Sequence, residues 1–379
     1  MKRKRVKKMV LGLIVAAVGL LVFVMVLFPP SRGKLPQFYD ENGEILKNSI
    51  AEKCELEVEN GSVRMIVLAK DITNPVLLIC GGGPGIPEYL LERMYPTNLA
   101  DQFVVCYLEY RGTGLSYDAD IKVADMTTET YVSDILSVTD YLKERFLQEK
   151  IYILGHSFGS YVAIKTVQQY PESYYAYIAM AQNCNQRESE YRAYDYMKEQ
   201  YELADDQKMV KKFEQYPIRE SQESYEKYFS SSLRDTAMHD LGVGTTRDMK
   251  SVISGIFFPS LRCSAYTWQE RINIRRGKAV SMEFPVVEES IEFHAFEEVP
   301  ALQIPIYFFA GKYDYTCCYS LQKEYYEQVE APKKEFYTFE NSAHSPLFEE
   351  PERAEEILGD ILSMTGENNK QYYVKKPQF

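Results

Sequence analysis

The feature that most constrains the fold is a short apolar run at residues 151–154, followed by Gly-His-Ser-Phe-Gly at 155–159 and then by a helical pattern. A serine between two glycines in this spacing is typical of a nucleophile elbow. This is a sharp strand-to-helix turn in which a Cβ at either flanking position would clash with the backbone, so both positions must be glycine. We therefore expect Ser157 to be a nucleophile and the Phe158 N–H to point at the oxyanion that forms during attack. An ordinary strand-to-helix turn is the alternative, but the apolar run before the serine and the i, i+4, i+8 pattern after it favour the elbow.

The first thirty residues predict a membrane anchor. Six of the first eight residues are Lys or Arg, and a run of twenty uncharged residues follows at 9–28. As a helix this run would span roughly 30 Å, the thickness of the hydrocarbon core of a bilayer. A cleaved signal peptide is the alternative, but its apolar region is usually about 7–15 residues long and ends in small residues. The positive-inside rule then places residues 1–8 in the cytoplasm and the rest of the chain outside the cell membrane.

Charge and cysteine usage narrow the possible partners. The chain has a net charge of −12, and without its six N-terminal positive charges the remainder carries −18. This acidity argues against nucleic acid as a partner. The seven cysteines are scattered and odd in number, so no disulfide framework is expected. Adjacent Cys317 and Cys318 are expected to pack in the interior, with a vicinal disulfide as the alternative.

Strand and helix patterns alternate along most of the chain and predict an α/β fold with a mostly parallel sheet flanked by helices. The expected elements are a hairpin over 54–69, strands over 76–80, 103–108, 151–154, 175–180, 304–310 and 334–339, and helices over 128–146, 320–329 and 351–364. The expected organisation is a cytoplasmic segment (1–8), a transmembrane anchor (9–28), a linker (29–46), a core (47–182), an inserted helical cap (183–299), the second part of the core (300–364) and a C-terminal tail (365–379).

A serine nucleophile needs a general base, and the chain contains four histidines. His344 lies in a loop directly after the last expected strand. Loops at the carboxyl ends of parallel strands meet at one edge of the sheet, where Ser157 is also expected. We therefore predict that His344 is the base. His156 is expected to point away from the attack face, and His239 and His294 are expected to be surface or packing residues of the cap.

The base in turn needs an orienting acid, and the oxyanion needs a second donor. Asp314 follows the expected strand over 304–310 and opens on the same edge, so we predict that it orients His344. The order Ser, Asp, His along the chain supports this assignment. Gly82, in the glycine loop after the strand over 76–80, is predicted to donate the second N–H, with Gly83 as the near alternative. No Gly-Lys-Ser/Thr follows this loop, which argues against a phosphate site.

Three stretches together resemble the α/β-hydrolase superfamily, and within it the proline iminopeptidase branch. They are Gly-Gly-Gly-Pro-Gly at 81–85, Glu-Tyr-Arg-Gly-Thr-Gly-Leu-Ser at 109–116 and the elbow. The branch usually shows His-Gly-Gly-Pro-Gly, Asp-Gln-Arg-Gly-x-Gly-x-Ser and Gly-x-Ser-x-Gly-Gly in this order. This chain departs from the pattern at Gly81, at Glu109-Tyr110 and at Ser160. The resemblance covers roughly residues 50–182 and 300–364, and it implies an α/β-hydrolase fold and a serine aminopeptidase that works through an acyl-enzyme.

The resemblance also implies that carboxylates of the cap bind the free α-ammonium group of the substrate. Cap aromatic residues are equally candidates to line an acyl pocket, so a carboxylesterase or lipase is the alternative to a peptidase. A non-catalytic binding module is the third possibility. The expected chemistry needs a small peptide or ester substrate but no metal and no organic cofactor. The candidate carboxylates are Glu270, Glu288, Glu289, Glu297 and Glu298, and the candidate aromatic residues are Phe257, Phe258, Tyr266 and Trp268.

Overall fold

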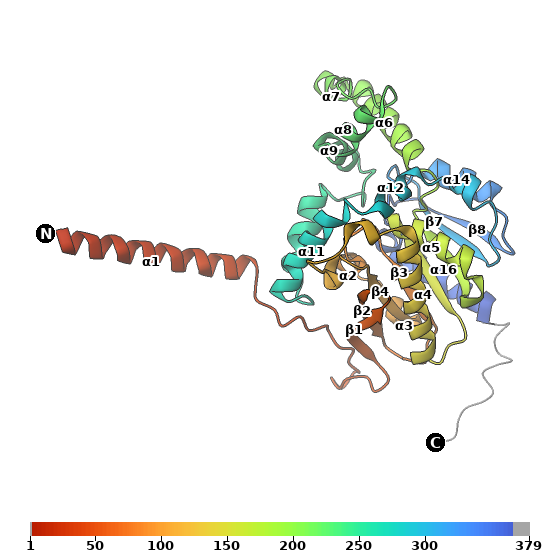
Figure 1. Ribbon diagram of the computed structural model, residues 1–379, viewed down its shortest axis with the longest axis horizontal. Coiled ribbons are helices and arrows are strands. Elements are labelled where there is room, and N and C mark those ends of the chain that lie inside the picture. Colours follow the sequence, from red (N-terminus) through yellow and green to blue (C-terminus); the bar gives the residue numbers. More distant parts are fainter. Residues whose placement is uncertain (1, 367–379) are drawn as a thin grey trace.

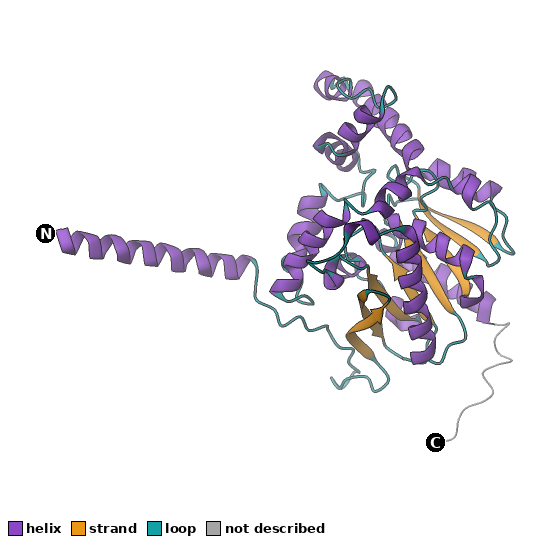
Figure 2. Cartoon of the chain, in the orientation of Figure 1, coloured by secondary structure: helices purple, strands orange, loops and turns teal. Residues whose placement is uncertain are grey.

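Eight strands form a single sheet in the computed structural model, which describes residues 2–366 (Figures 1 and 2). The strands run in the order β1-β2-β4-β3-β5-β6-β7-β8 across the sheet. Their bounds are β1 (Ile50–Val58), β2 (Gly61–Ala69), β3 (Val76–Cys80), β4 (Val104–Glu109), β5 (Ile151–His156), β6 (Tyr174–Met180), β7 (Ile306–Gly311) and β8 (Lys334–Phe339). Because β3, β4, β5 and β7 are buried along their whole length, they are almost continuously apolar and lie inside the sheet.

The sheet is mostly parallel, as expected. β1 pairs with β2 and β2 with β4 in antiparallel fashion, while the remaining neighbours are parallel. Helices cover both faces: α4, α5 and α14 pack on one face, and α2, α3 and α16 on the other. The expected arrangement of a mostly parallel sheet flanked by helices is therefore confirmed.

The buried positions of α4, including Tyr131, Ile135, Val138 and Leu142, follow the apolar periodicity of the sequence. Helices of seven residues or fewer carry too few residues to show a period. The bounds of the helices are α1 (Lys2–Leu27), α2 (Glu88–Met94), α3 (Leu99–Gln102), α4 (Thr128–Arg145), α5 (Phe158–Gln169), α6 (Gln186–Leu203), α7 (Gln207–Phe213), α8 (Gln222–Phe229), α9 (Ser232–Asp240), α10 (Phe258–Ser260), α11 (Trp268–Ser281), α12 (Pro285–Glu292), α13 (Ala295–Glu298), α14 (Tyr319–Gln328), α15 (Pro346–Glu349) and α16 (Pro351–Gly366). Short 3-10 segments at Gly114–Ser116, Val123–Asp125 and Pro171–Ser173 and a π-helical turn at Ile253–Phe257 complete the list.

The segment between β6 and β7 contains only helices among its regular elements, and it corresponds to the stretch predicted as a cap. α6 to α9 share a small apolar cluster of their own, which includes Met197, Phe213 and Tyr228. Figure 1 shows these helices at the top of the molecule, away from the sheet. α11 lies closer to the core, where Gly277 approaches the backbone of Thr113.

Helix α1 extends away from the rest of the chain in Figure 1 and overlaps the stretch for which an anchor is predicted. Over the part of the chain that the structure describes, none of the helices combines the length and apolar character that a membrane crossing requires. The side chains of several α1 residues lie outside that description. The anchor over 9–28 stays a prediction. The predicted tail over 365–379 lies outside the described residues from 367 onwards.

The elbow fits against β3 only because residue 159 has no side chain. A Cβ on Gly159 would lie 1.9 Å from the Cys80 carbonyl oxygen, which belongs to the backbone and cannot rotate away. We expect Gly159→Ala to lower the free energy of unfolding by about 3 kcal/mol, measured by urea denaturation. Gly359→Ala is the matched control: its Cβ would meet nothing closer than 3.6 Å, and in helix α16 the change should stabilise by roughly 0.5–1 kcal/mol. Equal unfolding midpoints for the two variants would contradict this packing.

Candidate active site

Ser157 stands between β5 and α5 in a backbone conformation that side-chain-bearing residues rarely adopt. Its φ is 57° and its ψ is −122°. Strain of this kind costs on the order of 1–3 kcal/mol and is usually found at functional sites. A Cβ on Gly155 would lie 2.6 Å from the Ser160 Cα, so the tight turn requires glycine before the serine as well. The predicted strand-to-helix turn is therefore present. The loops that carry Asp314 and His344 lie at the same edge of the sheet as Ser157.

His344 and Asp314 lie side by side at this edge. The Nδ1 atom of His344 is 3.1 Å from Oδ1 and 3.0 Å from Oδ2 of Asp314. Asp314 is completely buried, and its Oδ1 also accepts hydrogen bonds from the backbone N–H groups of Thr316 and Cys317 at 2.9 and 3.0 Å. Gln322 donates to Oδ2 at 3.2 Å. These donors stabilise an ionised carboxylate in a buried position and fix the side from which it meets His344.

The backbone of His344 is held from both sides. The N–H groups of Ala343 and Ser345 donate to Oε2 of Glu349 at 2.9 and 3.2 Å. Burial raises the pKa of Glu349 to about 7, although these hydrogen bonds act to lower it. On the other side, Nε2 of His156 lies 2.8 Å from the His344 carbonyl oxygen. His156 was expected to point away from the attack face; instead its ring joins the loop that carries His344.

The two predicted oxyanion donors have different surroundings. Phe158 is the first residue of α5, so its N–H has no partner within the helix. Gly82 approaches Ser157 closely, since a Cβ on Gly82 would lie 3.1 Å from the Ser157 Cβ. Its N–H, however, donates to Oε2 of Glu88 at 3.2 Å. In this conformation the Gly82 N–H is already engaged, which favours the near alternative, Gly83; both assignments stay predictions.

Ser157, Phe158, His344 and the glycine loop line one cavity of about 290 Å³. Its walls are mostly apolar, and the cap contributes more than half of the lining residues. Both the core and the cap contribute charged and apolar side chains to the wall. The charged and histidine lining residues are Glu88, His156, Arg234, Asp235, His239, Lys278 and His344, and the larger apolar ones are Ile86, Leu91, Phe158, Phe229, Met238, Val252, Ile256, Met282, Val287 and Ile291.

The cap residues that the sequence suggested for substrate binding are not the ones that line this cavity. None of the five candidate glutamates and none of the four candidate aromatic residues belongs to its wall among the described residues. Glu270 caps α11 and pairs with Lys53, Glu298 pairs with Lys165, and Tyr266 is fully buried against Glu109. Glu270, Glu298 and Tyr266 therefore have structural partners away from the cavity.

Asp235 is the cap carboxylate that does reach the cavity. It lies on α9 one turn before His239, whose Nδ1 is 3.2 Å from Asp235 Oδ1. The hydrogen bond from His239 lowers the pKa of Asp235, which is therefore ionised near neutral pH. The neighbouring Arg234 is neutralised by the buried Glu190. No local sequence signal distinguishes Asp235 from the other acidic residues of the cap. His239, expected to be a surface or packing residue, is 3% exposed and also lines the cavity.

Cys317 lies next to this site, because its backbone N–H donates to the Asp314 carboxylate at 3.0 Å. Burial raises the pKa of the Cys317 thiol well above its ordinary value, so the group stays protonated. Cys317 and Cys318 are both free thiols, and the alternative of a vicinal disulfide is not formed. Within the described residues, no group of three or more His, Cys, Asp or Glu side chains could hold a metal ion.

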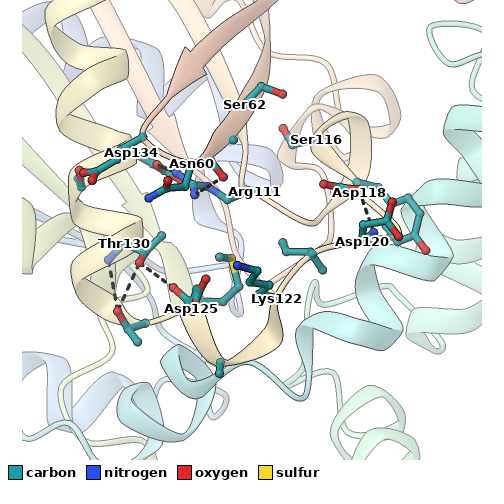
Figure 3. A pocket seen from close by; sticks show the side chains of 18 of the residues that line it. Asn60, Ser62, Arg111, Ser116, Asp118, Asp120, Lys122, Asp125, Thr130 and Asp134 are labelled. Atoms are coloured by element: carbon teal, nitrogen blue, oxygen red, sulfur yellow. Dashed lines mark hydrogen bonds and ion pairs between the residues drawn. The ribbon is translucent and has the colours of Figure 1, made fainter.

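A second cavity, of about 1070 Å³, lies apart from these residues (Figure 3). Its wall is polar and includes the buried ion pair between Arg111 and Asp134. Figure 3 shows Asp118, Asp120 and Lys122 on the facing loop. None of the predicted catalytic residues lines this larger cavity, so its size does not mark it as the place of the chemistry.

Comparisons with known proteins support a hydrolase. The sequence profile described as serine aminopeptidase, S33, matches residues 97–239, which include Ser157. The chain is 32% identical over 307 residues to the probable aminopeptidase YbaC of Bacillus subtilis (strain 168), covering 80% of this chain and 94% of that protein. It is similar in structure to the proline iminopeptidase of Mycobacterium smegmatis, with a TM-score of 0.62, 14% identity, and coverage of 84% of this chain and 100% of the other. An esterase of Thermogutta terrifontis gives a TM-score of 0.53 at 18% identity, with coverage of 83% and 99%.

Proposed function

The chain belongs to the S33 serine aminopeptidase family of α/β-hydrolases, and we propose that it removes the N-terminal residue, preferably proline, from short peptides through an acyl-enzyme. In this proposal Ser157 Oγ attacks the scissile carbonyl, and its proton passes to Nε2 of His344. Asp314 holds the imidazole in the tautomer that can accept this proton and stabilises the imidazolium. The Phe158 N–H and an N–H of the glycine loop, Gly82 or Gly83, stabilise the oxyanion. His344 then protonates the leaving amine, and water releases the acyl group.

The observation that carries the proposal is the cavity that Ser157 shares with His344 and with Asp235 of the cap. An aminopeptidase must recognise a positively charged α-ammonium close to the scissile bond. Asp235 offers an ionised carboxylate in the wall of a cavity that is otherwise mostly apolar. A small apolar side chain such as that of proline suits such walls, and the ammonium would pair with the carboxylate.

An esterase is the second candidate, because the same apolar walls suit an acyl chain. The structural likeness to an esterase is at only 18% identity, so it supports the fold and not this activity. The two candidates differ in whether a free amine is needed for turnover.

We expect the full-length protein in detergent to hydrolyse a proline 4-nitroanilide with a free amine and to lose this activity when the amine is acetylated. The reason is that acetylation removes the charge that Asp235 is proposed to recognise. A short-chain nitrophenyl ester serves as the comparison substrate, and Ser157→Ala should abolish every activity. Turnover of the ester alone would contradict the peptidase proposal and support the esterase. Activity that survives in Ser157→Ala would show that Ser157 is not the nucleophile.

Asp235→Asn should lower kcat/KM for the free-amine anilide roughly 10- to 100-fold, because a hydrogen bond to a charged group contributes about 1.5–3 kcal/mol. Hydrolysis of the nitrophenyl ester should change little. Glu288→Gln is the matched control: this carboxylate is exposed and lies outside the cavity wall, so both activities should be kept. An equal loss with both substrates in Asp235→Asn would argue for damage to the cap and against ammonium recognition.

Membrane anchoring through residues 9–28 is part of the proposal. It is supported by the six basic residues before an uncharged run of twenty, and by the continuous helix α1 over this stretch. The positive-inside rule then puts the catalytic domain on the outer side of the cell membrane. The segment after α1 remains in contact with the cap, since Arg271 donates to the Pro29 carbonyl at 2.8 Å.

Cell fractionation tests this anchoring. The full chain should stay in the membrane fraction after an alkaline carbonate wash, because an apolar span of this length is held in the bilayer. A chain that begins at Pro29 keeps the contact with Arg271 and should be soluble and active. Release of the full chain by carbonate would rule out a spanning anchor, and resistance to externally added protease would contradict the proposed orientation.

A further inference from the structure

Behind the predicted catalytic residues lies a buried pair, Glu88 and His156, to which the proposed mechanism assigns no role. Glu88 is the first residue of α2 and is 2% exposed, and His156 is the last residue of β5 and is 3% exposed. Oε1 of Glu88 is 2.7 Å from Nδ1 of His156. The other carboxylate oxygen accepts the Gly82 N–H, and the other ring nitrogen meets the His344 carbonyl oxygen at 2.8 Å.

The partners of this pair determine how many protons it carries. A carbonyl oxygen can only accept, so Nε2 of His156 must hold a proton to bind His344. The contact of Nδ1 with the carboxylate needs a second proton between the two atoms. The pair therefore holds one proton more than an ionised carboxylate with a neutral imidazole. Because Gly82 also donates to Glu88, the favoured arrangement is a carboxylate and an imidazolium.

Electrostatics agree with this proton count. Burial by itself lowers the pKa of His156, but the charge of Glu88 and the hydrogen bonds to Glu88 and His344 outweigh it, and the pKa is raised. The titratable groups that face His156 are Glu88, Asp314 and the His344 ring, whose centroid is 5.0 Å from that of His156. Glu349 contacts the backbone on either side of His344.

We propose that Glu88 and His156 are positioning residues: a buried imidazolium–carboxylate pair that ties the glycine loop to the loop of His344 and keeps His344 in its neutral, basic form. The inference rests on the proposed function of His344. The pair joins three segments distant in sequence, namely the loop after β3, the elbow and the loop after β8. The ring centroids of His156 and His344 are 5.0 Å apart, and Glu88 binds Nδ1, the ring nitrogen that does not contact the His344 carbonyl. With the cation as the nearer charge, the pair disfavours a second positive charge on His344.

The size of this effect can be bounded. At an effective dielectric constant of 20, a positive charge about 5 Å away lowers the pKa of an imidazole by roughly two, and the more distant carboxylate cancels roughly half of this effect. The acidic limb is the pH range in which the reactivity of Ser157 falls because His344 becomes protonated. Removal of both charges of the pair should move this limb upwards by about one pH unit. A role limited to packing would not move this limb.

The test measures the rate at which an alkyl fluorophosphonate inactivates the full-length protein between pH 5 and 9, with the adduct located by mass spectrometry. In this reaction Ser157 Oγ displaces fluoride from phosphorus and its proton goes to His344. The pH dependence of the rate therefore follows the protonation of His344, whatever the natural substrate is. The variants are Glu88→Gln and His156→Gln. In the first, an amide preserves all the hydrogen bonds around a neutral His156. In the second, the amide reaches the position of Nε2 and still donates to His344.

Both variants should shift the acidic limb upwards: Glu88→Gln by the stated amount, and His156→Gln by at least as much because the Glu88 carboxylate remains. Rates at pH 9 should stay within about tenfold of the wild type. The control is Glu109→Gln, the same change at a glutamate that is also 2% exposed but binds Tyr266 and Leu115 outside the cavity. Its limb should coincide with that of the wild type. Glu349, whose pKa is raised to about 7, is present in every variant and contributes equally.

The outcomes separate this inference from the proposed function. If the wild type is not labelled on Ser157, the proposed mechanism fails and the inference falls with it. If Ser157 is labelled but the limbs of both variants match the wild type, only the inference is overturned. A shift in one variant alone also overturns it, because the charge separation needs both residues. If one variant fails to fold, as judged by its melting temperature, the other decides: a limb that matches the wild type overturns the inference, and a limb shifted upwards supports it.

Discussion

The close approach of the elbow to the end of β3 is the contact on which the rest of the site depends. The absence of a side chain at Gly159 lets α5 start against the Cys80 carbonyl, and this places Ser157 next to Gly82. The left-handed backbone of Ser157 costs on the order of 1–3 kcal/mol, which the burial of β3 and β5 in the centre of the sheet offsets. Loops at the same sheet edge carry Asp314, His344 and the glycine loop, and helices of the cap add the remaining wall of the cavity.

The glycine loop is held from two directions, and this couples the cap to the chemistry. Glu88 of the core accepts the Gly82 N–H, while Lys278 of α11 donates to the Gly83 and Pro84 carbonyls at 3.0 and 3.1 Å. Burial lowers the pKa of Lys278 to about 8. α11 also binds the segment that follows α1, through the hydrogen bond of Arg271 to Pro29. The N-terminal segment, the cap and the glycine loop are thus linked by hydrogen bonds.

Much of this arrangement could be predicted from the sequence, because its signals are local. Apolar runs and helical periodicity predict the strands and the main helices. Because Ser157, Asp314 and His344 each follow an expected parallel strand, the sequence also predicts that they lie at one edge of the sheet. The partners that depend on tertiary contacts were missed. Glu88 lies on a helix too short to show a period, and Asp235 is one acidic residue among many in the cap. The cap glutamates that the family resemblance suggested have structural or solvated positions instead.

The most direct test of the account is a crystal structure of the protein bound to the boronic acid analogue of proline. Boron should be bonded to Ser157 Oγ, with one boronate oxygen against the Phe158 N–H and an N–H of the glycine loop. The second donor, Gly82 or Gly83, would be identified at once, and the pyrrolidine ammonium should face Asp235. Boron bonded elsewhere, or an ammonium directed away from Asp235 and towards solvent, would contradict the proposed mechanism or the proposed recognition, respectively.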